Sequence, residues 1–338
     1  MGMVGGLDLH RRQITYDWVD GETGDCQRGM IRPVTRESFR EWLGRFRDAD
    51  AAFAVEATTG WRFVVEELER AGCSAHLAEP AETRALRGRK RRAKTDRADA
   101  RHLRDLLVHQ ILPESWIPTP FIADLRTKVR LRKTMIDQRS GWAKRIKAQF
   151  FHHGWPTPPS ALTIAGREYM AQADLPPTAR QVVDAGLAMI AALDTQIELV
   201  DADIRALARV QKGCVVLQTQ WGVGPIVSAA MLGELGDVTR MRSSSQAVRF
   251  AGLDVTIHDS DGKGPPGHLS RQGPSVLRWA VGEAATGAWR PGSPDHDYYQ
   301  ATKARLGTSR ARVSVARKIL RRSYHLLANL GEVAIEPV

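Results

Sequence analysis

Four acidic residues in the first hundred positions constrain this chain more than any other feature. Asp8 and Glu56 each end a short apolar run, and Asp96 and Asp99 lie three positions apart. A carboxylate at the end of a buried strand is costly unless it is paired, hydrogen-bonded or bound to a cation. Because Mg²⁺ prefers oxygen ligands, this pattern predicts a site that gathers Mg²⁺.

The order of apolar patterns predicts an α/β domain at the N-terminus. Strands are expected at residues 3–9, 14–20, 27–33, 51–56 and 75–78, with helices after Thr35, at 61–70 and from Thr95 to about His109. Three strands followed by alternating helices and strands are the layout of an RNase H-like (RuvC-like) domain. The first and fourth strands of such a sheet are neighbours, so the acids at their ends converge. Acids at positions i and i+3 add to them from one helix face, and four such groups can hold two Mg²⁺ ions.

Each acid also has an ordinary interpretation. Asp96 and Asp99 could be first-turn acids favoured by the helix dipole. Glu56 could be a solvated strand end, and Asp8 could be a turn residue. We interpret His10 as a surface residue rather than a ligand. The metal-site hypothesis depends on all four acids falling at the right elements in the right order.

Composition limits the classes of function. The 338 residues favour two domains, and a net charge of +11 with a pI of about 9.9 indicates a phosphate-rich partner such as nucleic acid. The three widely spaced cysteines suggest neither a disulfide framework nor a zinc site. No apolar stretch is long enough to span a membrane, and the N-terminus lacks a signal-peptide core. We therefore expect a cytoplasmic protein, associated with the nucleoid when active.

A basic segment directly precedes Asp96. Ten of the 21 residues from Arg84 to Arg104 are Arg or Lys. A charge run of this kind is usually solvated, but its position favours contacts to a phosphate backbone beside the acids. The candidate nucleic-acid-binding residues here are Arg87, Arg89, Lys90, Arg91, Arg92 and Lys94.

The rest of the chain is expected to be mainly helical. We predict an N-terminal acidic domain at 1–112, a linker and coiled-coil helices at 113–211, and a C-terminal domain at 212–338. Apolar residues recur every seven positions from Ile122 to Phe150, which predicts either a coiled coil or a helical hairpin. A Gly222-Val223-Gly224 turn resembles a helix-hairpin-helix element, although a plain glycine-rich turn fits as well.

A polar loop in the C-terminal third holds a candidate nucleophile. Ser260 lies in a Gly- and Ser-rich stretch near Lys263 and Arg271, which we expect to bind nucleic acid. Serine is a weak nucleophile without activation, and no His-Asp triad is evident. An ordinary turn serine is the alternative interpretation.

Across nearly its full length the chain resembles the DEDD transposases, the IS one-ten family of insertion-sequence recombinases. Its Gly-Leu-Asp-Leu-His, Val-Glu-Ala-Thr-Thr-Gly-Trp and Lys-Thr-Asp-Arg-Ala-Asp blocks resemble the RuvC-like domain of that family. Its Gly-Val-Gly-Pro, Phe-Ala-Gly-Leu, Ser-Asp-Gly-Lys and Leu-Ser-Arg-Gln-Gly-Pro blocks resemble the C-terminal transposase domain. The chain departs from the pattern at Asp254, Asp259 and Asp261, which lie in or near the serine loop.

The resemblance implies catalytic roles and partners. Asp8, Glu56, Asp96 and Asp99 match the four metal-holding acids, and Ser260, preferred over Ser270 and Ser275, matches a serine that forms a covalent phosphoserine with DNA. Mg²⁺, with two ions per site, is the implied cofactor. Donor and target DNA, a noncoding bridge RNA and a dimer or tetramer of this chain are the implied partners. Base pairing would then select the sequence, as in other RNA-guided systems.

Two other functions stay open at this point. The first is a RuvC-like, metal-dependent nuclease or Holliday junction resolvase that uses the acids without a serine nucleophile. The second is a non-catalytic protein that only binds nucleic acid. Replacing Ser260 with alanine separates recombinase from nuclease, and replacing Asp8 with asparagine separates both from a pure binder.

Overall fold

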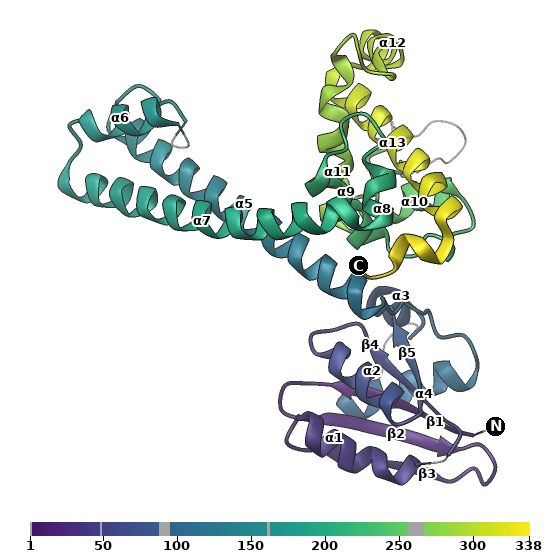
Figure 1. Cartoon of the computed structure of the whole chain (residues 1–338). Helices are drawn as coiled ribbons and strands as arrows, with labels where there is room; N and C mark the ends of the chain where they lie inside the picture. Colours follow the sequence, from purple (N-terminus) through teal and green to yellow (C-terminus); the bar gives the residue numbers. More distant parts are fainter. Residues whose placement is uncertain (1, 48, 88–94, 161–162, 256–266) are drawn as a thin grey trace. The chain divides into compact units, whose positions relative to one another are not determined.

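The computed structural model describes residues 2–47, 49–87, 95–160, 163–255 and 267–338 (Figure 1). The chain divides into two compact units, one that ends at Ile117 and one that begins at Pro118. Each unit is built around its own elements and is described by itself below.

The first unit is built on a mixed five-stranded sheet (Figure 1). Its strands are β1 (Met3–Leu9), β2 (Ile14–Asp20), β3 (Cys26–Ile31), β4 (Ala51–Glu56) and β5 (Ser74–Ala78), in the spatial order β3-β2-β1-β4-β5. β1 pairs antiparallel with β2, and β2 with β3, whereas β1 and β4, and β4 and β5, pair in parallel. This arrangement fits the predicted α/β RNase H-like domain, with β1 beside β4 as the sequence indicated.

Two faces of the sheet are covered in different ways. Side chains alternate between the faces of a strand, so neighbouring glycines of β1 point in opposite directions. A Cβ at Gly5 would meet the ring of Phe53, which belongs to the aromatic core that also includes Phe39, Trp42 and Phe46. A Cβ at Gly6 would instead meet the backbone of Ala100, in the helix on the other face. The two glycines therefore allow close packing on both sides of β1.

The helices of the first unit begin at clear sequence signals. They are α1 (Arg36–Leu43), α2 (Trp61–Arg70), α3 (Pro80–Ala85) and α4 (Asp96–Val108), and a short 3-10 turn, Gly44–Phe46, follows α1. The hydroxyls of Thr35 and Thr95 accept hydrogen bonds from the backbone N–H of Ser38 and Ala98, which caps α1 and α4. Gly72 adopts a φ of 80° just after α2, as expected for a glycine that ends a helix.

Helix α4 is fixed over the sheet by a buried ion pair. The guanidinium of Arg104, 7% exposed, donates to the carboxylate of Asp17 on β2, which is 5% exposed. The same guanidinium donates to Asp105 at 2.6 Å. Because a buried charge without a partner is costly, this pair favours the observed position of α4 on the sheet.

The second unit begins with two long helices that lie side by side (Figure 1). α5 (Pro120–His152) and α7 (Pro177–Val210) are joined through α6 (Ile164–Gln172). Ile146 and Phe150 of α5 pack with Ile190 of α7, and Arg132 forms an ion pair with Asp201. These contacts lie within one chain, as the hairpin alternative requires. Coiled-coil pairing with a second protomer stays a prediction.

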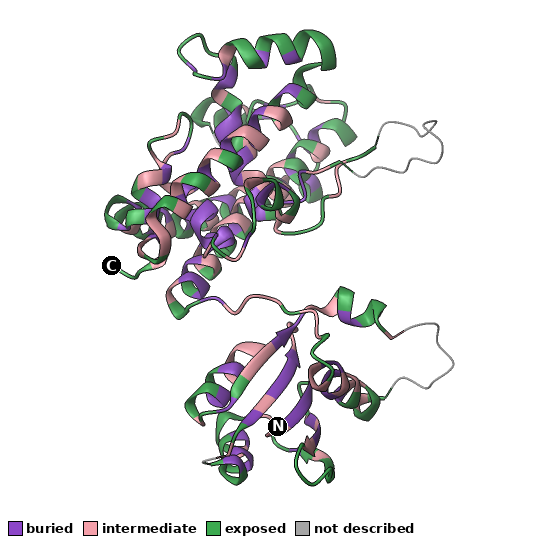
Figure 2. Cartoon of the chain, turned by 90° about the vertical axis from the view of Figure 1, so that its right-hand side faces the viewer, coloured by how far each residue is buried: buried purple, intermediate pink, exposed green. Residues whose placement is uncertain are grey.

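The remaining elements are helical, in agreement with the mainly helical C-terminal region that was predicted. They are α8 (Lys212–Leu217), α9 (Pro225–Leu235), α10 (Ser244–Phe250), α11 (Ser275–Ala284), α12 (His296–Leu306) and α13 (Thr308–Leu330), with 3-10 turns at Ala285–Trp289 and Gly331–Ile335. α9 is buried along nearly its whole length. Buried residues are purple in Figure 2. Among the described residues, no helix has the length and apolar character that crossing a membrane requires.

Candidate metal centre

The parallel pairing of β1 and β4 brings two of the acids to one edge of the sheet. Leu7 pairs with Val55, so Asp8 and Glu56 each follow at the carboxyl end of its strand. Asp96 and Asp99 occupy the first turn of α4, which packs against β1. All four predicted acids are therefore carried by three neighbouring elements.

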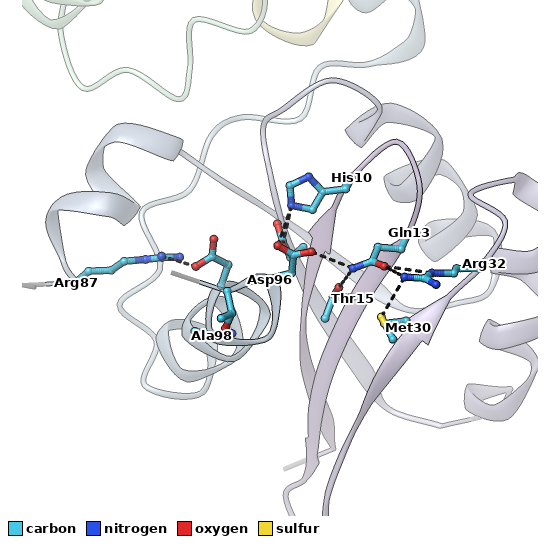
Figure 3. A network of polar contacts seen from close by, with 11 residues as sticks. His10, Gln13, Thr15, Met30, Arg32, Arg87, Asp96 and Ala98 are labelled. Carbon is cyan, nitrogen blue, oxygen red and sulfur yellow. Dashed lines mark hydrogen bonds and ion pairs between the residues drawn. The ribbon is translucent and has the colours of Figure 1, made fainter. Parts of the chain in front are cut away.

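Three side chains form a compact group of possible metal ligands, namely those of Asp8, His10 and Asp96 (Figure 3). One donor atom from each lies within 4.8 Å of the others. Nε2 of His10 lies 3.2 Å from Oδ2 of Asp8 and 3.5 Å from Oδ1 of Asp96. The imidazole thus stands between a carboxylate of β1 and a carboxylate of α4.

The environment of the Asp8 carboxylate would favour a bound cation. The residue is only 9% exposed, and its Oδ2 atom is buried without a hydrogen bond of good geometry, although His10 lies nearby. The pKa of Asp8 is raised to about 6, mainly by burial; the charge of His10 opposes this rise, and the charges of Asp99, Asp96 and Glu56 add to it. A divalent cation would relieve both the desolvation and the repulsion, so these residues fit a metal.

Asp99 and Glu56 lie close enough to Asp8 for their charges to act on it, but they are outside the group of three. The carboxylate of Asp99 is engaged by Arg87, whose Nη1 lies 2.5 Å from Oδ1 (Figure 3). Among the described residues of the predicted basic segment, Arg87 is the one with an ion pair to an acid of the site. Glu56 is half-buried at the end of β4.

A chain of polar side chains holds Asp96 from the side of the sheet. Nε2 of Gln13 donates to Oδ2 of Asp96 at 2.9 Å, and Nε of Arg32 donates to Oε1 of Gln13 at 3.1 Å (Figure 3). Oδ1 of Asp96, the other oxygen, faces His10. Neither Gln13 nor Arg32 was predicted from the sequence, because the contact of Gln13 with Asp96 depends on how the turn after β1 folds.

Comparisons with known proteins agree with this architecture. A model of the DEDD transposases of the IS110 group matches residues 6–152, and a model of the IS116/IS110/IS902 transposase family matches residues 214–300. The first match contains all four acids of the metal centre. The chain belongs to the IS110 family of transposases.

Two curated relatives are similar to parts of this IS110-family chain. The "Insertion element IS116 uncharacterized 44.8 kDa protein" of Streptomyces clavuligerus is 27% identical over 220 residues, which cover 60% of this chain and 52% of that protein. The "Probable family 20 transposase" of Pseudomonas aeruginosa is 33% identical over 91 residues, 27% of this chain and 25% of that protein. The chain thus spans about half the length of the first relative and a quarter of the second.

The predicted serine of this IS110-family chain lies outside the described residues. So do Lys263 in the same loop and five of the basic candidates, Arg89, Lys90, Arg91, Arg92 and Lys94. The described residues on either side of the loop meet at its base, where Val255 and Leu269 form an antiparallel bridge and the hydroxyl of Ser270 donates to Asp254. Arg271 is exposed with a φ of 52°, and its backbone N–H bonds to the carbonyl of Gly252 at 3.1 Å.

The glycine turn before α9 has a packing role in this fold. Gly222 adopts a φ of 81°, and a Cβ there would lie 2.3 Å from the carbonyl oxygen of Ala284 at the end of α11. A side chain at this position would therefore be strained in its backbone and in collision with α11. This contact gives Gly222 a packing role, and the helix-hairpin-helix interpretation of the turn stays a prediction.

Proposed function

We propose that this chain is the transposase of an insertion sequence, a DNA recombinase that depends on Mg²⁺. The observation that carries the proposal is the buried, unsatisfied Oδ2 of Asp8 opposite Asp96, within the region that the DEDD transposase model matches. An electrostatically unsatisfied carboxylate beside a basic segment suits a phosphate substrate held through divalent cations.

Under this proposal Asp8, Glu56, Asp96 and Asp99 hold two Mg²⁺ ions. When bound, such ions stabilise negative charge on the attacking and leaving oxygens of a phosphate. Asp99 would first have to release Arg87, which it now binds at 2.5 Å. Gln13 keeps Asp96 oriented through its second oxygen, so that Oδ1 stays directed toward His10.

The proposed chemical step is a transesterification by Ser260. Its hydroxyl oxygen forms a bond to a DNA phosphorus, and one phosphodiester P–O bond breaks. The serine proton ends on the released deoxyribose oxygen, so that a phosphoserine and a free hydroxyl result. The matching position of Ser260 in the family loop supports this assignment. The proposal has two forms, in which the acids that act with Ser260 belong either to the same protomer or to its partner.

The proposed partners follow from charge and from the family. Donor and target DNA would contact the basic residues beside the acids and Arg271. A bridge RNA from the element would select the sequences, and a dimer or tetramer would assemble through the α5–α7 hairpin. We also propose the domain bounds that the sequence suggested. The acids lie in a domain of residues 1–112, a helical linker covers 113–211, and the serine loop lies in a domain of residues 212–338.

A trapping assay tests the function. The full chain, donor and target duplexes, flanking element RNA and Mg²⁺ are incubated, and DNA–protein adducts are resolved on a denaturing gel and mapped by mass spectrometry. We expect an adduct on Ser260 that is lost in Ser260→Ala and in Asp8→Asn but kept in Ser275→Ala, the matched serine control. Strand cleavage that leaves no adduct and survives Ser260→Ala would identify the RuvC-like nuclease instead. DNA that stays intact with every variant, and binds equally well to Asp8→Asn, would leave only a binding protein.

A further inference from the structure

The ring of His10 is directed toward two carboxylates, an orientation that a purely surface role does not require. It follows β1 directly, and its backbone N–H donates to the carbonyl of Gln13 at 2.9 Å, which closes the turn. This turn directs Nε2 to Asp8 and Asp96, although the side chain is 54% exposed and could extend into solvent. The ring therefore approaches the two carboxylates from the open side of the site.

We propose that His10 is a nitrogen ligand of the cation that Asp8 and Asp96 hold, and that it shifts the preference of this site toward Mn²⁺. The inference rests on the proposed metal function of the two acids. It adds a donor of different chemistry to a set that otherwise contains only oxygen.

The spacing of the donor atoms supports a shared ion. Adjacent ligands of an octahedral ion lie about 3 Å apart when each metal–ligand distance is about 2.1 Å. The separations of 3.2 and 3.5 Å from Nε2 to the two carboxylate oxygens are close to this value. All three donors can therefore reach one ion with small movements of an exposed ring.

The environment of the two carboxylates supports the same assignment. Oδ2 of Asp8 is buried and has no well-formed hydrogen bond, whereas Oδ2 of Asp96 is already engaged by Gln13. Oδ2 of Asp8 and Oδ1 of Asp96 are the oxygens that face His10. A histidine that served only as a hydrogen-bond partner would be expected to satisfy the buried oxygen of Asp8.

Ligand chemistry gives the expected selectivity. Mg²⁺ strongly prefers oxygen and retains its waters, whereas imidazole suits transition metals. Removing His10 should therefore weaken Mn²⁺ binding much more than Mg²⁺ binding. A fall in Mn²⁺ affinity of at least about tenfold is expected, because even the outer-shell partners of metal ligands have effects of that size.

The test uses Mn²⁺ itself as the probe, on the full chain without DNA. Pulsed electron paramagnetic resonance reports nitrogen hyperfine coupling to bound Mn²⁺, and titrations give the affinities for Mn²⁺ and Mg²⁺. We expect the coupling in the natural protein and in His109→Ala, and its loss in His10→Ala. His109 is a matched control because it is an exposed histidine at the other end of α4. Circular dichroism verifies that each variant folds.

The outcomes separate this inference from the proposed function. Nitrogen coupling that persists in His10→Ala, or is missing from the natural protein with Mn²⁺ bound, overturns the role of His10. If that happens while Asp8→Asn abolishes Mn²⁺ binding, the metal site stands and only the nitrogen ligand is wrong. If Asp8→Asn binds Mn²⁺ as tightly as the natural protein, the proposed metal centre itself fails.

Discussion

A side chain at Gly6 would place its Cβ 2.1 Å from the carbonyl oxygen of Ala100 and 2.6 Å from the backbone nitrogen of Arg104. β1 and α4 are therefore in backbone contact at this point, two residues before Asp8 and four residues after Asp96. The distance between these two acids depends on a residue that has no side chain.

Gly6→Ala should disturb both folding and metal binding. The added methyl group must push α4 away from β1, and overpacking of this kind costs about 1–3 kcal/mol of unfolding free energy. Because Asp96 moves with α4, Mn²⁺ affinity should fall as well. Urea unfolding and Mn²⁺ titration measure the two effects. Gly44→Ala, at a site with open space and a φ of −53°, should leave both unchanged.

Asp8→Asn should stabilise the metal-free protein at neutral pH. The folded-state pKa of Asp8 is about 6, above the usual 3.8, so the native state holds a proton more tightly than the unfolded state does. Stability from this group is present below about pH 4 and is lost as the pH rises to about 6. The loss amounts to at most about 3 kcal/mol.

Denaturant unfolding at pH 4 and pH 7 in the presence of a chelator measures this difference. We expect the stability gap between Asp8→Asn and the natural protein to widen in favour of the variant at pH 7. Added Mn²⁺ should reverse the order, because only the natural protein keeps the ligand. An unchanged gap at the two pH values would contradict the assigned burial of Asp8.

Glu67→Gln should show the opposite dependence on pH. Glu67 on α2 is 1% exposed, and Arg40, Arg36 and Arg70 bind its carboxylate at 2.6 to 2.7 Å. Hydrogen bonding to Arg40, then to Arg36 and Arg70, lowers its pKa to about 2 against the desolvation that raises it. The stabilisation is therefore present above about pH 4.5 and declines as the pH falls toward 2.

The variant should thus be clearly less stable than the natural protein at pH 7 and nearer to it at pH 3. Thermal unfolding at these two pH values is sufficient to compare them. Glu66→Gln is the matched control, because Glu66 is an exposed neighbour that binds only Arg36 among the described residues. A loss of stability that is the same at both pH values would show that shape rather than charge is important at Glu67.

The ion pair of Arg104 and Asp17 can be tested with a double-mutant cycle. Arg104→Met alone leaves the carboxylate of Asp17 buried without its partner, which should cost about 3–5 kcal/mol. Adding Asp17→Asn removes the uncompensated charge and should recover part of that loss. Urea unfolding of the four proteins gives the coupling energy. If the losses of unfolding free energy are additive, the two side chains have no energetic coupling.

The sheet and its helices could be predicted because their signals are local. Thr35 and Thr95 cap helices, Gly72 ends one, and the apolar runs before Asp8 and Glu56 define neighbouring strands. Strand order then follows from the pattern of connections, which places the ends of β1 and β4 at the same edge.

The finer contacts of the site could not be predicted, because they join residues that are distant in the sequence. We interpreted His10 as a surface residue, and its side chain is indeed 54% exposed, but its ring also lies between Asp8 and Asp96. The signal was its spacing, since residues i and i+2 of an extended strand share a face. The contact of Gln13 with Asp96 gave no such signal, because it depends on the exact path of the turn after β1.

The candidate metal centre joins the first strand of its unit to the last helix, and Gln13 and Asp96, which meet there, are 83 positions apart. A nascent chain that has left the ribosome only as far as β5 carries Asp8 and Glu56 but lacks Asp96 and Asp99 of α4. Assembly of the candidate centre therefore cannot precede the synthesis of α4. A copy of the gene interrupted before α4 would encode all five strands of the sheet but only two of the four candidate acids.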